Sequence, residues 1–161
     1  GNVDEVPSEL IAHHYMLGEQ FAPACEAWFE AAQRAMGRYA HVEAVSHLRH
    51  ALEALQAQPP SAQRDTREVE LQSALAMSLG TIQGLSSPEV EATQERLLAL
   101  VGQVADVPHE IFFGLWNFYA SKGRLQQARD LARQRLAHAD AQHDRDARLL
   151  ASYTSAASDL F

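Results

Sequence analysis

The chain has 161 residues, of which 47% are hydrophobic and only 7% aromatic, so its length suits one domain over residues 1–161 and its composition favours helix over sheet. A formal charge of −8, from 13 basic and 21 acidic residues, argues against the phosphate-neutralising surface that nonspecific nucleic-acid binding requires. The single cysteine, Cys25, excludes an internal disulfide and fits a reducing cytoplasm, and no apolar stretch approaches the ~20 residues that span a bilayer. We therefore expect a cytoplasmic protein with neither a nucleic-acid nor a membrane partner.

The first predicted helix begins at Pro7-Ser8-Glu9, where Ser8 is expected to cap it, and ends at Gly18. Its expected core stripe is Leu10, Ile11, His14 and Tyr15.

Two further helices are predicted over residues 21–36 and 41–56, the second of them ended by Pro59-Pro60. At a spacing of 20 residues they share a pattern of small, bulky and small side chains, namely Ala24, Trp28 and Ala31 against Ala44, Leu48 and Ala51. The core residues expected in addition are Phe21, Cys25, Ala32 and Ala35 in the first, and Val45, Leu52 and Leu55 in the second.

The next helix is predicted over residues 62–83 and ends at Gly84. Ser87-Pro88-Glu89 then supplies a cap, a proline at the first helical position and an acid that the helix dipole favours. The expected core positions of these two helices are Leu71, Ala74, Leu75, Leu79 and Ile82, followed by Val90, Leu97, Leu100, Val101 and Val104.

A break at Asp106-Val107-Pro108 starts a helix that ends at Gly123. This helix is apolar nearly all round, so we expect it to be the most buried element of the chain. A seventh helix is expected to carry Leu125, Ala128, Leu131, Ala132, Leu136 and Ala139, and an eighth, capped by Asp144, to carry Leu149, Leu150 and Tyr153. The sequence thus predicts an all-α fold of about eight helices, with no linker long enough to divide it.

Leu115 and Tyr119 recur as Leu149 and Tyr153 at a spacing of 34 residues, which is the tetratricopeptide period. The order of small, aromatic and turn residues resembles that repeat twice, in Ala12, Tyr15, Glu19, Ala24, Trp28 and Ala31 and in Leu115, Tyr119, Gly123, Ala128 and Ala132. Trp116 and Arg135 stand where the repeat has small residues, so the array is irregular. The resemblance implies a right-handed superhelix of antiparallel helix pairs that binds its ligand on the concave face.

The whole chain also looks like the helical repeat region that follows the ATPase domain in bacterial multidomain signalling proteins, often with an adenylate or guanylate cyclase domain at the amino end. The blocks that carry this resemblance are Ile11-Ala12-His13-His14-Tyr15, residues 24–28, residues 43–49, Ser87-Pro88-Glu89-Val90 and residues 114–119. It implies a regulatory or sensor array that acts on linked ATPase or cyclase domains, and a chain that is a piece of a longer protein. The phosphate-binding loop and the metal-binding acid pair of those domains do not occur in this sequence, so neither activity is expected here.

In tetratricopeptide arrays, solvent-side positions of the first helix of each pair contact the ligand. Carried over by register, they are Glu9, His13 and Met16, then Glu70, Ser73 and Met77, and then Glu110, Phe113 and Asn117. Phe113 has two interpretations: burial against an adjacent helix pair, which the all-round apolar pattern favours, or a place in a binding groove.

Several other side chains invite a chemical interpretation. Glu43, His47 and His50 share one side of a helix, but a site without a fourth ligand favours solvated side chains with a Glu43–His47 pair over a metal centre. His14 is expected to be packed and His13 exposed.

Cys25 lies on an apolar stripe that should raise its thiol pKa, so no catalytic nucleophile is expected. Arg135 falls within an apolar arc, and we expect it to snorkel and to pair with an acid such as Asp146, or else to face the groove.

The sequence therefore predicts a non-catalytic protein-interaction or sensor module in a cytoplasmic regulator, with no metal or cofactor. Its partner is expected to be a protein, a peptide, or the protein's own ATPase and cyclase domains. The two alternatives are a plain adaptor that switches nothing and a small-molecule receptor with a pocket near Phe113, Trp116 and Met77.

Overall fold

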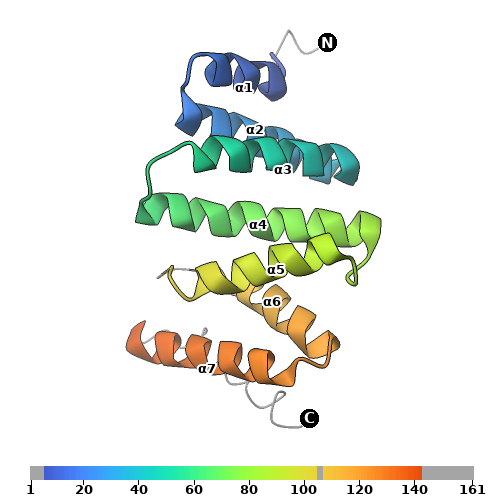
Figure 1. The fold of residues 1–161 in the computed structure, drawn as a ribbon, viewed down its shortest axis with the longest axis vertical. Helices are drawn as coiled ribbons and strands as arrows, with labels where there is room; N and C mark the ends of the chain where they lie inside the picture. The colour runs from blue at the N-terminus through green and yellow to red at the C-terminus, as the bar shows by residue number, and fades with distance from the viewer. Residues whose placement is uncertain (1–5, 105–106, 143–161) are drawn as a thin grey trace. The chain divides into compact units, whose positions relative to one another are not determined.

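The computed structural model describes residues 6–104 and 107–142, with the side chains of the second range described up to residue 137. These residues form seven helices and no strand (Figure 1), which confirms the all-α prediction. None of these helices has the length and apolar character needed to cross a membrane. The eighth helix expected from Asp144, Leu149, Leu150 and Tyr153 lies outside the described residues.

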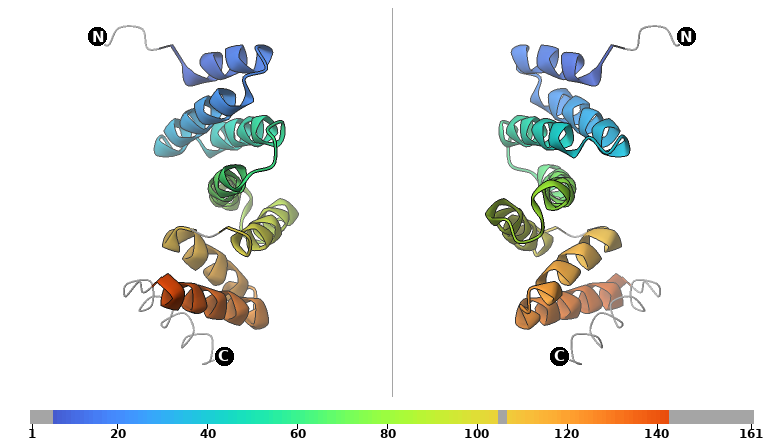
Figure 2. Two further views of the ribbon diagram at one scale, coloured as in Figure 1. Left: turned by 90° about the vertical axis from the view of Figure 1, so that its left-hand side faces the viewer. Right: turned by 90° about the vertical axis from the view of Figure 1, so that its right-hand side faces the viewer.

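The chain forms two compact units, residues 1–105 and 106–161. In the first unit consecutive helices contact one another and run antiparallel, as Figures 1 and 2 show. Its helices are α1 (Ser8–Leu17), α2 (Phe21–Gly37), α3 (His41–Gln56), α4 (Ala62–Gln83) and α5 (Pro88–Val101). The predicted boundaries of α3 and α4 are confirmed to the residue.

Three of the turns between helices share one hydrogen-bonding geometry. After α1, the Gln20 amide donates to the Tyr15 carbonyl (2.9 Å) and the Glu19 amide to the Met16 carbonyl (3.1 Å). The same pair of bonds recurs after α2 and α6, where the Ala40 amide reaches Ala35 and the Arg124 amide reaches Tyr119, both at 2.9 Å. This is the Schellman arrangement, whose penultimate residue adopts a left-handed conformation. The left-handed residues are Glu19 (φ 54°), Tyr39 (φ 61°) and Gly123 (φ 70°).

The helix following each of these turns begins in the same way. The first amide to donate a helical hydrogen bond belongs to an alanine, and it donates to the carbonyl four residues earlier. These alanines are Ala24, Ala44 and Ala128, and each is at most 1% exposed. The small side chain lets the new helix lie close to its predecessor, so the sequence pattern at a spacing of 20 residues corresponds to a repeated corner.

Serine caps begin α4 and α5. The Ser61 and Ser87 hydroxyls accept from the amides of Arg64 (3.1 Å) and Val90 (3.2 Å), and Pro88 occupies the first turn of α5 as predicted. The expected Ser8 cap of α1 is wrong: Pro7 is the cap residue, and the buried Ser8 hydroxyl donates instead to Glu30 Oε2 at 3.4 Å.

The core of unit 1 centres on α2 and α3, where nearly every predicted apolar position is buried; only Phe21 is partly exposed. In α4 and α5 the predicted leucines and valines are buried, but Ile82 is 41% exposed, and Ala74 and Val104 are half-buried. A buried carboxylate joins these two helices: Glu68 accepts from Arg96 Nε (2.7 Å) and Nη2 (2.8 Å). This two-point bond raises the pKa of the Arg96 guanidinium.

The predicted core stripe of α1 is wrong. Leu10 is 57% exposed and Ile11 36% exposed, whereas the buried residues are Ser8 and Ala12. Small side chains allow α1 to approach α2 closely, and the bulkier residues are left on a face that no other described helix covers. The predicted packing of His14 is wrong as well, since this residue is exposed.

The second unit contains α6 (His109–Ser121) and α7 (Leu125–Gln142), which pack against each other. The prediction that α6 is the most buried element is wrong: four of its 13 residues are buried, against seven of 17 in α2. Phe112, Leu115, Phe118 and Tyr119 form its inner face. Among the described helices of unit 2 only α7 packs against α6, and apolar content alone does not bury a helix that one neighbour covers.

Candidate functional site

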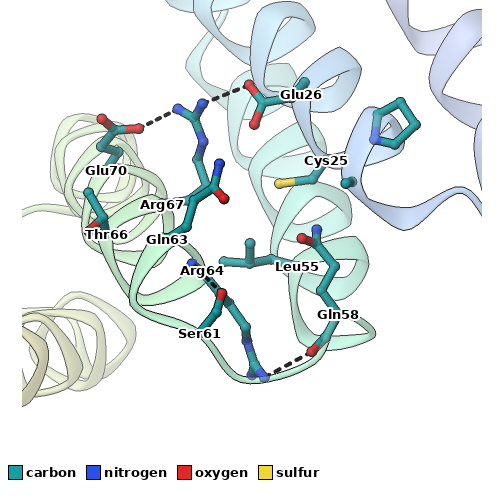
Figure 3. Close-up of a pocket in the computed structure, with 12 residues that line it drawn as sticks. Cys25, Glu26, Leu55, Gln58, Ser61, Gln63, Arg64, Thr66, Arg67 and Glu70 are labelled. Atoms are coloured by element: carbon teal, nitrogen blue, oxygen red, sulfur yellow. Dashed lines mark hydrogen bonds and ion pairs between the residues drawn. The ribbon is translucent and has the colours of Figure 1, made fainter.

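A pocket of about 580 Å³ opens where the start of α2, the end of α3 and the first three turns of α4 meet (Figure 3). We call it the Arg67 pocket. Most of its lining residues are polar, although apolar side chains contribute about half of the wall, and Glu70, one of the predicted ligand-contacting residues, belongs to it. The lining residues are Ala22, Pro23, Cys25, Glu26, Leu55, Gln58, Ser61, Gln63, Arg64, Thr66, Arg67 and Glu70.

Arg67 is the central charge of this pocket. Its Nη2 donates to Glu26 Oε2 of α2 at 2.8 Å, and its Nη1 donates to Glu70 of the next turn of α4. The guanidinium also lies 5.4 Å from the ring centroid of Phe29. One arginine thus ties α4 to α2, and two carboxylates that are 52% and 37% exposed remain accessible to a partner.

The end of the pocket nearest the α3–α4 connection is held by side-chain bonds to the backbone. Gln58 Nε2 donates to the carbonyls of Phe21 and Ala54, both at 3.3 Å, and Arg64 Nη1 donates to the Gln58 carbonyl at 3.1 Å. These bonds fix the connection between α3 and α4, so the pocket wall is preformed.

Cys25 lies in the wall of the pocket but is only 1% exposed. Burial, reinforced by the negative charge of Glu26 and opposed by Arg67, raises the pKa of its thiol to about 11. The predicted direction of this shift is confirmed. A neutral thiol at physiological pH is a weak nucleophile, so Cys25 serves here as a packing residue.

The three predicted contact residues of α4 share one face, on which Glu70 and Ser73 are partly exposed. Glu70, Ser73 and Met77 follow at intervals of three and four residues, which places them above one another on a helix. Met77 is 57% exposed. Its carbonyl accepts a hydrogen bond of 2.9 Å from the hydroxyl of Thr81, which lies one turn further along α4. The face therefore leads from the Arg67 pocket towards the end of α4.

A second depression, of about 650 Å³, lies where that face ends, between the last turn of α4 and the start of α3. We call it the Tyr39 hollow. Its lining residues are Tyr39, Ala40, His41, Val42, Glu43, Ser46, His47, Thr81 and Ile82. The predicted face of α4 thus connects two depressions of different chemistry, one charged and one largely apolar.

The predicted contact residues of α1 lie elsewhere in unit 1. Glu9 lines a smaller depression of about 310 Å³ with Arg34 and Arg38. His13 packs its ring edge-on against Trp28, with centroids 4.8 Å apart, and Met16 is half-buried.

Histidines surround the buried indole of Trp28. His47 stacks on it at 5.3 Å between centroids and His50 lies at 4.7 Å. The predicted Glu43–His47 pair is present at 3.5 Å. The predicted solvation is confirmed for Glu43 and His50, whose side chains are 45% and 43% exposed, and is wrong for His47, whose side chain is only 12% exposed. Sequence reasoning placed these histidines on the polar side of α3 and could not see that α2 brings an indole to that side. Among the described residues, no three His, Cys, Asp or Glu side chains converge as metal ligands.

Glu110, Phe113 and Asn117 are exposed on one side of α6 in unit 2. Phe113 is 43% exposed and stacks on Trp116, with centroids 5.8 Å apart. Within the described residues Phe113 is thus only partly covered, and its burial against an adjacent helix pair and its place in a binding groove both stay predictions. Met77 belongs to unit 1, so the receptor pocket expected near Phe113, Trp116 and Met77 would draw on both units and stays a prediction.

Arg135 of α7 lies with its guanidinium carbon 5.4 Å from the ring centroid of Phe112. Its partial burial fits the predicted snorkelling side chain, and the contact with an aromatic face was not foreseen. The expected partner Asp146 lies outside the described residues.

Sequence reasoning found Glu70 but missed Arg67 and Glu26. The spacing of Arg67 and Glu70 by three residues was a readable signal for an ion pair on one helix. Glu26 is 41 residues away from Arg67, and no local pattern indicates that contact. No protein-family model matches the chain, and a search of curated proteins gives no significant match.

Proposed function

We propose that this protein is a non-catalytic docking module and that the exposed face of α4 binds an extended segment of a partner protein. The observation that carries the proposal is the continuous line of Glu70, Ser73 and Met77 between the Arg67 pocket and the Tyr39 hollow. A face that joins two depressions can bind both ends of an extended peptide. Two chemically different end sites give affinity and also fix the direction in which the peptide binds.

The dimensions suit a short peptide. Eleven residues separate Glu70 from Thr81, which is roughly 16 Å along a helix at about 1.5 Å per residue. An extended chain covers that length with about five residues. The charged pocket favours a polar or charged group at one end of the peptide, since Glu26 and Glu70 can accept hydrogen bonds and Arg67 can donate them.

We further propose that the helices are repeats of the tetratricopeptide kind, and that the module belongs to a cytoplasmic bacterial regulator in which it acts on linked ATPase or cyclase domains. The three equivalent corners at Glu19, Tyr39 and Gly123 support the repeat interpretation, because each joins two helices by the same turn and is followed by the same buried alanine. Binding would regulate a linked domain only if the partner had unequal affinity for its active and inactive states.

The docking proposal is tested by selecting peptides from a random phage-displayed library on the immobilised chain and measuring their affinity by fluorescence anisotropy. Arg67→Ala, Glu70→Lys and Met77→Glu should each weaken a selected peptide by about tenfold or more, the effect of losing about 1.4 kcal/mol of contact. Glu53→Lys, a charge reversal at a 64% exposed α3 side chain outside both depressions, is the matched control. Selected peptides that bind all three variants as tightly as the unchanged chain would refute the proposed site.

A further inference from the structure

Among the described residues, Arg64 is the one charged side chain in the wall of the Arg67 pocket that has no oppositely charged partner. Glu26 and Glu70 are both engaged by Arg67. Arg64 makes a single side-chain hydrogen bond, from Nη1 to the Gln58 carbonyl at 3.1 Å, and its Nε is buried without an acceptor. A guanidinium carries five N–H donors, so the described residues leave most of the hydrogen-bonding capacity of Arg64 unused.

The stability of α4 does not explain the charge of Arg64. Arg64 is the third residue of this helix, where the helix dipole disfavours a cation. The pKa of Arg96 in α5 is raised by Glu68 and further by Asp65, so the acid next to Arg64 in the sequence is directed towards α5. The hydrogen bond to the Gln58 carbonyl requires a donor but no charge. A half-buried charge is stabilised by an opposite charge, and here that charge must come from a ligand.

The surroundings of Arg64 suit a carboxylate that has an apolar neighbour. Figure 3 shows the Arg64 guanidinium beside Gln58, at the other end of the pocket from the Arg67 guanidinium, with Leu55 and Cys25 between the two ends. Gln63 is exposed in the same turn, and no described group bonds its side-chain amide, which can donate a second hydrogen bond. A depression of about 580 Å³ has room for more than one side chain of a ligand.

We propose that Arg64 binds the side-chain carboxylate of an aspartate or glutamate in the docked segment, while a neighbouring apolar side chain of that segment covers Leu55 and Cys25. This inference rests on the proposed docking function and names the chemistry of the partner at the Arg67 pocket. Charge-assisted hydrogen bonds from a guanidinium to a carboxylate are shorter and stronger than neutral ones, so this contact contributes both affinity and selectivity.

The position of Arg64 also gives the docked segment a direction. Arg64 and Arg67 continue the line of Glu70, Ser73 and Met77 along α4 at intervals of three and four residues. The acidic residue therefore lies at the end of this line nearest the α3–α4 connection, and the rest of the segment runs towards the Tyr39 hollow.

Three synthetic tetrapeptides, acetylated at the amino terminus, provide the probe. The first is acetyl-Leu-Glu-Leu-Ala-amide, the second has Gln in place of Glu, and the third has that Gln together with a free carboxyl terminus. Binding is followed by NMR chemical shifts of the isotopically labelled chain. The first peptide should shift the signals of Arg64, Leu55 and Cys25. It should bind about tenfold or more tightly than the other two, the change that corresponds to about 1.4 kcal/mol.

Substitutions of Arg64 separate binding from pocket structure. Arg64→Gln removes the charge but keeps a donor for the Gln58 carbonyl, so it should abolish the preference for the Glu peptide over the Gln peptide and leave the unfolding midpoint nearly unchanged. A distorted pocket would instead weaken both peptides equally. Arg64→Lys keeps the charge and should retain part of the preference. Arg34→Gln, the same change at an exposed arginine outside the pocket, is the matched control and should retain all of it.

The inference is overturned if the Glu peptide shifts no signal in the pocket, if the Gln peptide binds equally well, or if Arg64→Gln retains the preference. A peptide with a free carboxyl terminus that binds as tightly as the Glu peptide would assign the site to a chain end and would also overturn it. The docking function is judged separately on the peptides selected from the library. If these still lose affinity in Arg67→Ala and Met77→Glu, docking on α4 stands without this carboxylate site.

Discussion

Replacing Arg67 by alanine removes the only side chain that the structure shows bridging Glu26 of α2 and Glu70 of α4. It deletes a 2.8 Å hydrogen bond to Glu26, the bond to Glu70 and the contact with the Phe29 ring. Both carboxylates stay in place, so the variant makes the pocket more negative by one charge without opening the core.

The cost to stability follows from the exposure of these groups. The Arg67 side chain is 30% exposed and the two carboxylates 52% and 37%, so each ion pair is solvent-screened and contributes about 0.2–1 kcal/mol. The contact with Phe29 adds about 0.5–1 kcal/mol. We expect Arg67→Ala to lower the free energy of unfolding by about 1–3 kcal/mol, which lowers the melting temperature by roughly 2–12 °C.

The assay is urea denaturation followed by circular dichroism at low salt and at high salt. Screening should reduce the difference between Arg67→Ala and the unchanged chain, because its ionic part weakens as the Debye length shortens. Arg67→Lys keeps the charge and loses the two-pronged geometry, so it should recover only part of the loss. In a double-mutant cycle with Glu26→Gln, a coupling energy near zero would refute the bridge between α2 and α4.

Three further predictions concern the core, the buried thiol and the backbone. Leu48→Ala should cost about 3–5 kcal/mol of unfolding free energy in urea denaturation, since Leu48 is 0% exposed; Val42→Ala on the same helix should cost less than about 1 kcal/mol, and equal losses would contradict the packing described. The pKa of Cys25 is raised from 9.0 to about 11, so its stability contribution is complete below pH 9 and is lost as pH rises through 11, because the unfolded thiol ionises first. The loss of roughly 3 kcal/mol should vanish in Cys25→Ala, and an identical alkaline profile of the two proteins would refute it. In unit 2, Gly114→Ala should stabilise by about 0.5–1 kcal/mol, since its added Cβ meets nothing within 4 Å, whereas Gly123→Ala, at φ 70°, should destabilise by about 1 kcal/mol; melting temperatures that move in the same direction would contradict this pair.

Helix boundaries were readable because their determinants are local. Ser61 and Ser87 cap their helices through their own side chains, and Gly84 ends α4 at the expected residue. The inner face of α2 was equally readable because the helix packs between α1 and α3. A helix that is covered on two sides buries most of its circumference, so nearly every apolar residue in it can be assigned to the core from the sequence.

The face of α1 and the surroundings of the histidines were not readable. An apolar stripe shows which side of a helix avoids water, but the small residues Ser8 and Ala12 decided which side α2 could approach. His47 looked polar from its own helix, yet it stacks on Trp28 of α2. Both errors arise at contacts between helices. There the shapes of the side chains decide which face of a helix is buried, and hydrophobicity alone does not predict that choice.

The sequence by itself determined the seven described helices, the Ser87 cap and the central core, because hydrogen bonding of helix ends and burial of a regular stripe depend on neighbours a few residues away. Only the tertiary structure decided that Arg67 meets Glu26 across 41 residues and that Tyr39 and Ile82, from different helices and turns, line one hollow. Contacts between distant segments depend on how closely and at what angle helices pack, and that geometry is set by the three-dimensional fit of many side chains at once.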